Sequence, residues 1–144
     1  MEPFDPLLLE NQLCFPLYAA SREVIKRYHP HLTALGLTYT QYITLMVLWA
    51  EGQISAKALG QRLYLDSGTL TPVLKSLEDK GYLRRFRSPE DERVLMTALT
   101  EAGRALKKEA AAIPEKISGC VKLNAEEAIE LYRLLYKLLT ALQE

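Results

Sequence analysis

Residues 53–103 read QISAKALGQRLYLDSGTLTPVLKSLEDKGYLRRFRSPEDERVLMTALTEAG, and this stretch decides the fold. Ser55 is a favourable N-cap for a short helix that is predicted to end at Leu63. Asp66 offers a cap for a second helix, which is predicted to run to Lys80. A helix, a turn and a second helix in this order predict a DNA-reading motif.

The second helix is the candidate reader because its polar side chains fall on one side. Its leucines and Val73 recur at helical spacing and predict a buried face. The remaining small hydroxyl and basic side chains suit base edges and phosphates. Gly68 either permits close approach to the DNA backbone or only helps to cap the helix. The predicted DNA-contacting residues of this helix are Ser67, Gly68, Thr69, Thr71 and Lys75.

A charged hairpin follows the reader. Gly81 ends the helix, and residues 82–87 and 93–98 are predicted as two strands joined by the turn-rich SPED. Because a basic hairpin after such a helix pair forms a wing, the predicted fold is mainly α with a small β wing, a winged helix-turn-helix. The arginines expected at DNA are Arg84, Arg85, Arg87 and Arg93.

The formal net charge is zero, but the charges are unevenly distributed. Residues 53–89 carry 7 basic and 3 acidic side chains, against 3 and 5 in residues 1–52 and 8 and 10 in residues 90–144. Phosphate attraction is local, within a Debye length of about 8 Å at physiological salt, so a basic patch on a neutral protein can bind DNA. The alternative is a solvated hairpin whose arginines pair with Glu90, Asp91 and Glu92.

Composition limits the class of protein. With 144 residues, of which 49% are hydrophobic and 25% charged, the chain is expected to form one globular domain over 1–144. No run approaches the ~20 apolar residues that span a bilayer, and the acidic start MEPFDP does not resemble a secretory signal. We therefore expect a cytoplasmic protein with no membrane partner. Two cysteines, Cys14 and Cys120, are too few for a disulfide scaffold.

The wing and several upstream blocks resemble a known family. Asp91 and Arg93, with Leu99, Thr100 and Gly103, are similar to the DxRxxxxxLTxxG signature of the MarR family of bacterial transcription regulators. ENQLCFPLYAASRE, LTYTQY and RLYLDSGTLTPVLK resemble its organic hydroperoxide resistance branch, called OhrR. The resemblance covers almost the whole chain. It implies that Arg93 enters a DNA groove and that Asp91 orients its guanidinium.

Helices outside the reader suggest a partner. Leucines recur on one face of a helix that Asn124 and Glu127 are predicted to begin as a capping box. Such surplus apolar surface fits a symmetric dimer, whereas packing within one subunit is the other explanation. The resemblance implies that residues 1–35 and 100–144 are dimerisation helices around a reader at 53–99. Two readers would then bind a pseudo-palindromic operator in double-stranded DNA.

Cys14 decides the functional hypothesis. A cysteine among apolar neighbours is either a small core residue or a reactive thiol. The resemblance implies the second, in a pocket where phenols of the partner subunit favour the thiolate and apolar walls favour organic hydroperoxides. The implied pocket residues are Phe15, Tyr18, Tyr28 and Tyr39.

Oxidation would convert Cys14 to a sulfenic acid, which then condenses with a second thiol. The candidates are Cys120, near the resolving cysteine of two-cysteine relatives, and a low-molecular-weight thiol. The resemblance implies a repressor that releases its promoter after this reaction.

Other function classes were weighed against this hypothesis. A MarR-like regulator could bind a phenolic or aromatic ligand, with Cys14 only structural. A thiol peroxidase would use Cys14 with turnover, and a winged protein-interaction module would bind DNA weakly and without sequence preference. His29 and His31 form no metal-ligand cluster with the cysteines, and the sequence has neither a phosphate-binding glycine loop nor a nucleophile elbow. We expect no enzyme, metal or cofactor.

Two residues depart from the family pattern. Pro16 lies inside the helix predicted for residues 6–28, where it is expected to bend the chain beside Cys14. Ser76 stands where several relatives carry arginine, so a phosphate contact is expected to be missing.

Overall fold

The computed structural model describes residues 3–143. It is mainly helical with one small antiparallel sheet, as the sequence predicts. The chain divides into two compact units, residues 1–113 and 114–144, which are described separately. The prediction of a single domain over 1–144 stays a prediction. No helix of residues 3–143 combines the length and the apolar character that crossing a membrane requires.

The first long helix, α1, spans Cys14–Thr33 and follows a short 3₁₀ turn, η1, at Leu9–Asn11. The prediction of one helix over 6–28, bent at Pro16, was therefore wrong. Pro16 is the third residue of α1, where a backbone N–H has no acceptor inside the helix. The carbonyl that it would have bonded, that of Gln12, precedes the helix, so the proline costs no helical hydrogen bond.

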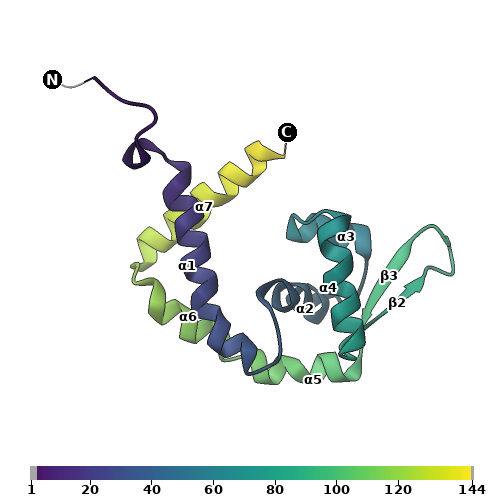
Figure 1. Ribbon diagram of the computed structural model, residues 1–144. Coiled ribbons are helices and arrows are strands. Elements are labelled where there is room, and N and C mark those ends of the chain that lie inside the picture. The colour runs from purple at the N-terminus through teal and green to yellow at the C-terminus, as the bar shows by residue number, and fades with distance from the viewer. Residues whose placement is uncertain (1–2, 144) are drawn as a thin grey trace. The chain divides into compact units, whose positions relative to one another are not determined.

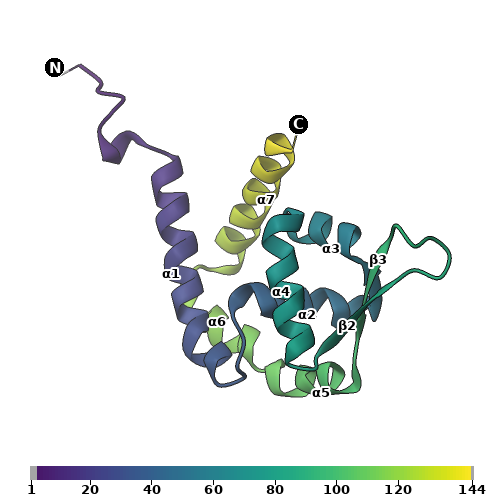
Figure 2. The same cartoon turned by 45° about the vertical axis from the view of Figure 1, so that its right-hand side comes forward.

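Helix α2, Tyr39–Glu51, forms the centre of the first unit. Thr38 and Gln41 form a reciprocal capping box at its start. Leu45 and Leu48 have no exposed surface, and α2 contacts α1, α3, α4, α5, β1 and β3. Figures 1 and 2 show α4 lying across it.

The predicted helix-turn-helix is confirmed. Helix α3 spans Ala56–Leu63 with Ser55 as its N-cap, and helix α4 spans Ser67–Asp79 with Asp66 as its N-cap. The turn between them places Tyr64 in the left-handed region at φ 56°, which is uncommon for an aromatic residue. The buried face of α4 consists of Leu70, Leu74 and Leu77.

The wing is a three-stranded antiparallel sheet in the order β1-β3-β2. The predicted hairpin is formed by β2, Leu83–Arg87, and β3, Leu95–Leu99, and it projects beyond α4 (Figure 1). The third strand, β1 at Gln53–Ser55, was not predicted. Three residues are too few to show an alternating pattern, and β1 exists through its pairing with β3, where Ile54 lies opposite Thr97.

Helix α5, Glu101–Ala110, packs on α2 within the first unit. Gly103 accepts a hydrogen bond from Trp49 Nε1 at 2.8 Å, and Thr100 caps the helix. Helix α5 ends at Ala110, and Pro114 lies in the first turn of the next helix, α6, which begins at Ile113.

The second unit contains the rest of α6, Ile113–Val121, and α7, Ala125–Leu142. Asn124 and Glu127 form the predicted capping box. No residue of α7 is buried within this single chain, although the helix carries a row of large apolar side chains. The exposed ones include Ile129, Leu131, Leu134, Leu138 and Leu142.

The close approach at Gly103 generates a stability prediction. A Cβ at this position would lie 2.1 Å from the carbonyl oxygen of Tyr82, so Gly103→Ala requires α5 to shift. We expect a loss of about 1–3 kcal/mol in the free energy of unfolding, measured by urea denaturation at fixed protein concentration. Gly119→Ala is the matched control, because a Cβ there meets nothing within 4 Å. Equal stability of the two variants would contradict the prediction.

Candidate nucleic-acid interface and thiol site

The polar face of α4 is exposed as the sequence predicts. Its N-terminal turn is fixed by Asp66, whose Oδ1 accepts the Thr69 N–H at 2.7 Å. This bond holds the pKa of the Asp66 carboxyl below its usual range. Thr71 Oγ1 donates to the Ser67 carbonyl at 2.7 Å, which leaves the hydroxyl oxygen as an acceptor. The residues expected to face DNA are all exposed: Ser67, Gly68, Thr69, Thr71 and Lys75.

Arg93 is held out from the wing. Its Nε and Nη2 donate to the two carboxylate oxygens of Asp91 at 3.0 and 3.1 Å, and its backbone N–H donates to Oδ1 at 3.0 Å. These bonds lower the pKa of Asp91. The Arg93 side chain nevertheless remains 90% exposed. A bidentate pair of this kind fixes the direction of the guanidinium while its outer N–H groups stay available.

The other wing arginines differ in their surroundings. Arg85 donates to Glu78 of α4 through both its backbone N–H, at 2.9 Å, and its guanidinium, at 3.1 Å. It therefore ties the wing to the reading helix. The Arg84 guanidinium lies 4.5 Å from the centre of the Phe86 ring and stays exposed, as does Arg87.

Cys14 is exposed at the first residue of α1, and its predicted pocket neighbours Phe15 and Tyr18 are exposed beside it. Arg22 donates to the Tyr18 phenol oxygen at 3.1 Å. Tyr28 lies on the same helix, 14 residues further on. At 1.5 Å per residue this separation is about 21 Å. A single chain therefore cannot bring Cys14 and Tyr28 together.

Tyr28 and Tyr39 do meet each other. Their ring centres are 5.0 Å apart, and Tyr42 completes the cluster at 5.9 Å from Tyr28. Burial raises the pKa of all three phenols above the ordinary 10.0. A phenol hydroxyl of this kind can donate a hydrogen bond. Tyr42 is not among the pocket residues expected from the sequence, although its spacing from Tyr39 places both on one helical face.

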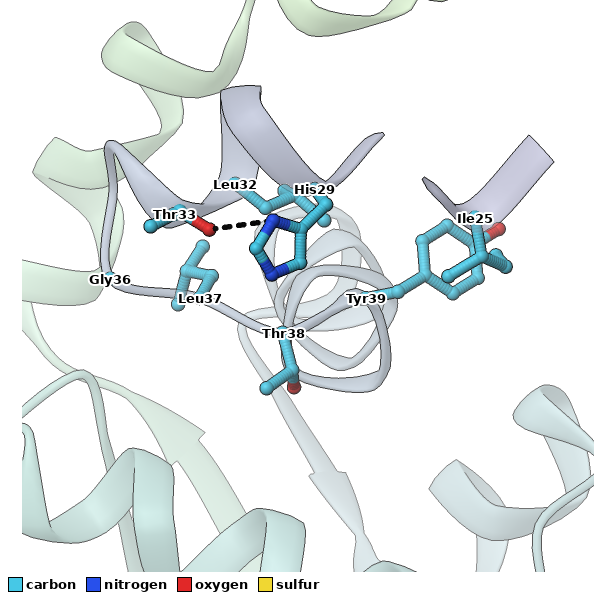
Figure 3. A pocket seen from close by; sticks show the side chains of 8 residues that line it. All are labelled: Ile25, His29, Leu32, Thr33, Gly36, Leu37, Thr38 and Tyr39. Atoms are coloured by element: carbon cyan, nitrogen blue, oxygen red, sulfur yellow. Dashed lines mark hydrogen bonds between the residues drawn. The ribbon is translucent and has the colours of Figure 1, made fainter. Parts of the chain in front are cut away.

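A cavity of about 430 Å³ lies next to this cluster. Figure 3 shows its walls, formed by the end of α1 and by the loop that leads into α2. His29 Nδ1 and Thr33 Oγ1 share a hydrogen bond of 3.3 Å on one wall, and Ile25 and Tyr39 lie on another. The lining is mostly apolar, with these few polar groups.

The second cysteine belongs to the other unit. Cys120 is exposed near the end of α6, and its thiol donates to the Lys116 carbonyl at 3.5 Å. Within residues 3–143 no group of three or more His, Cys, Asp or Glu side chains is arranged to hold a metal ion.

Sequence reasoning missed a polar contact behind the reader. Ser76 Oγ accepts a hydrogen bond from Nε2 of the buried Gln41 at 2.8 Å. Gln41 Oε1 also accepts from Lys80 Nζ at 3.0 Å. In the sequence, the one sign of this contact is that Gln41 and Ser76 are polar residues at the edges of the apolar faces of their two helices.

Similar proteins give these features a context. Residues 26–110 match the family described as Transcriptional regulator SarA/Rot. The chain is 49% identical over 141 residues to the organic hydroperoxide resistance transcriptional regulator of Bacillus subtilis (strain 168), which covers 98% of this chain and 96% of that protein.

Four solved structures of AbfR are also similar, one of them described as AbfR of Staphylococcus epidermidis. Reduced AbfR bound to DNA has a TM-score of 0.77 at 38% identity and covers 94% of this chain and 96% of that chain. Overoxidised AbfR bound to DNA has 0.76 at 37%, with 93% and 94% covered. Disulfide-formed AbfR has 0.68 at 37%, with 94% and 93% covered.

The Arg85–Glu78 contact generates a pH prediction. The Arg85 side chain lowers the pKa of Glu78 below its ordinary 4.5, so the contact stabilises the fold above that pH and is lost as the pH falls through the folded pKa. We expect Glu78→Gln to lower the melting temperature at pH 7, and this difference to shrink below pH 4.5. Glu90→Gln is the control, since Glu90 forms no ion pair within residues 3–143. A pH-independent difference would contradict the assignment.

Proposed function

The chain belongs to the MarR family of transcription regulators, in the branch of the organic hydroperoxide resistance regulators, and we propose that it is a repressor that releases its operator when Cys14 is oxidised. The observation that carries this proposal is an exposed reading surface, with Arg93 held out by Asp91, in the same chain as an exposed thiol at the start of α1. Its relatives are named as regulators rather than enzymes, which supports switching without turnover.

DNA is bound by two wings and two reading helices of a homodimer. The polar face of α4 enters the major groove, and Arg93 enters the adjacent minor groove, where a narrow groove attracts a guanidinium. In a symmetric dimer the two α4 helices read half-sites roughly 34 Å apart. This geometry requires a pseudo-palindromic operator, and we expect the protein to act in the cytoplasm, where that DNA lies.

The sensing pocket is shared between two subunits. Since α1 separates Cys14 from Tyr28 by about 21 Å, the phenols that reach Cys14 are Tyr28 of the partner subunit and Tyr39 of the partner subunit. Residues 1–35 and 100–144 supply the dimer contacts, which would cover the exposed apolar row of α7. The hydroxyl groups of both phenols can donate hydrogen bonds to an anionic sulfur.

The chemistry begins with attack by the Cys14 thiolate on an organic hydroperoxide. A sulfur–oxygen bond forms and the O–O bond breaks. The hydroperoxide is reduced to an alcohol, whose oxygen takes up a proton, and the sulfur is oxidised to a sulfenic acid. A second thiol then displaces water from the sulfenic acid and forms a disulfide. The apolar side chains of Phe15 and Leu17 favour peroxides with an organic group.

The proposed trigger for release of DNA is formation of the disulfide. Addition of oxygen to the cysteine sulfur is not sufficient by itself. AbfR is bound to DNA both in its reduced and in its overoxidised form, and it also has a disulfide-formed state. We assign the second thiol to Cys120 of the partner subunit, because Cys120 is exposed and its sulfur is available. A low-molecular-weight thiol is the alternative partner.

The cavity beside Tyr39 favours a second candidate function. Its volume of about 430 Å³ and mostly apolar lining suit a small phenolic or aromatic ligand. In that case Cys14 is structural, and peroxide has no effect on DNA binding.

The first test uses fluorescence anisotropy of a labelled fragment of the gene's own upstream region at fixed salt. Wild-type protein is expected to bind tightly, to lose binding after an organic hydroperoxide and to regain it after a thiol reductant. Cys14→Ser is expected to bind but not to respond. Binding that ignores peroxide in the wild type would reject the sensor and favour the ligand-responsive alternative.

Cys120→Ser separates the two possible second thiols. If Cys120 resolves the sulfenic acid, this variant retains DNA binding after peroxide in the absence of any added thiol. Non-reducing gel electrophoresis should then show a disulfide-linked dimer in the oxidised wild type and none in Cys120→Ser. Release that is unchanged in Cys120→Ser would contradict its resolving role.

The wing is tested by charge-matched variants. Arg93→Ala is expected to weaken operator binding by roughly 1–3 kcal/mol, because it removes an oriented groove contact. Lys57→Ala is the control, since it removes one exposed positive charge from α3, outside the dimerisation helices and the predicted DNA-contacting residues. Equal losses in the two variants, measured by anisotropy, would show that only net charge matters.

A further inference from the structure

A buried amide joins the reading helix to the loop before α2. Gln41 is 6% exposed. Its Oε1 accepts the backbone N–H of Thr38 at 3.0 Å, and its Nε2 donates to Ser76 Oγ of α4 at 2.8 Å. One side chain therefore holds both the first turn of α2 and the C-terminal half of the reading helix.

Lys80 closes the same network. Its ammonium, just after α4, donates to Gln41 Oε1 at 3.0 Å and to the carbonyl oxygen of Gly36. The end of the reading helix is thus bonded to the loop over residues 34–38 as well as to α2. These contacts all lie within the first unit.

The loop that is bonded in this way also forms the wall of the phenol pocket. Tyr39 follows the N-cap Thr38 directly and packs on Tyr28 at 5.0 Å. Gly36, Leu37, Thr38 and Tyr39 line the cavity shown in Figure 3. A displacement of Tyr39 consequently displaces the residues that Gln41 and Lys80 bind.

The hydrogen bonds of the Gln41 amide restrict how the loop and the reading helix can move relative to each other. Both acceptor positions of Oε1 and one of the two Nε2 donors are used in a largely buried site. Breaking one of these bonds while the amide stays buried leaves an unpaired polar group, which is costly. The network therefore favours one arrangement of loop and reading helix over intermediate ones.

We propose that Gln41 is a positioning residue that transmits the state of the Tyr28–Tyr39 pocket to α4 through Ser76 and Lys80. This inference rests on the proposed redox function. In the reduced protein the network holds α4 in the orientation that fits the operator. Oxidation of Cys14 moves Tyr39, and the loop then pulls Gln41 and Lys80 away from that arrangement. Gln41 contacts neither the DNA nor the peroxide in this scheme.

The test compares operator affinities of reduced and oxidised protein in two α2 variants. Gln41→Leu removes the amide and keeps a side chain of similar length. Thr44→Val is the matched control, because Thr44 is also buried in α2 and its hydroxyl bonds only to Thr40 of the same helix. Ser76→Ala removes the Gln41–Ser76 bond and leaves the α2 cap in place. Lys80 is left unchanged, so that net charge near the DNA stays constant.

We expect Gln41→Leu to weaken binding of reduced protein by about 3- to 10-fold and to leave the oxidised protein nearly unchanged, so that the redox response shrinks by the same factor. Ser76→Ala should shift in the same direction by less, and Thr44→Val should keep the wild-type ratio. A loss of affinity that is equal in both redox states would show a merely structural role and would overturn the inference.

The reduced-state arm separates failure of this inference from failure of the proposed function. If the wild type ignores peroxide, the redox function is rejected. The Gln41–α4 contact is still tested by the reduced affinities of Gln41→Leu and Ser76→Ala against Thr44→Val. Reduced affinities equal to that of Thr44→Val would overturn the positioning role in either case.

Discussion

The burial of α2 is the constraint on which the first unit depends. Leu45, Leu48 and Thr44 have no exposed surface, and the helix touches α1, α3, α4, α5 and the sheet. Trp49 adds a hydrogen bond to Gly103 of α5. Packed interiors do not deform continuously, so α2 and the elements around it move as bodies. The same helix carries Tyr39 at its start and Gln41 two residues later, so the pocket wall and the contact to the reading helix lie in the same turn of α2.

The length of α1 imposes a second constraint. A straight helix fixes the distance between Cys14 and Tyr28, and no side-chain rotation closes about 21 Å. Any chemistry that needs the thiol and the phenols together must therefore take one from each of two chains. In the proposed function, sensing depends on the dimer, because a covalent bond formed at Cys14 acts on the relative placement of two subunits. Operator binding depends on that same placement. Oxidation at Cys14 and recognition of DNA are therefore coupled through the relative position of the two subunits.

The parts of the fold that the sequence predicted are those with local signals. Asp66 as a cap and Gly81 as a helix stop act within a few residues, so the reader and hairpin were located within one or two positions. Pro16 misled the prediction of α1, because proline is tolerated in a first turn and marks a start as well as a break. The strand β1 and the Gln41–Ser76 contact, 35 positions apart, depend on tertiary pairing that periodicity does not contain. For the candidate site, the resemblance implied both the residues and the partner-subunit origin of the phenols, whereas the length of α1, which keeps Cys14 and Tyr28 of one chain apart, comes from the structure.

Electrostatics alone would give a poor account of the reader. Residues 53–89 carry an excess of positive charge, yet Arg85 is committed to Glu78 and Lys80 to Gln41 and Gly36. Two of the cations in that excess therefore hold the wing and α4 in place. Arg93 lies outside residues 53–89 and pairs with Asp91, which fixes the direction of its guanidinium while the side chain stays 90% exposed. A protein of zero formal net charge can recognise DNA in this way, because a few cations with a fixed orientation can act in place of a large excess of positive charge.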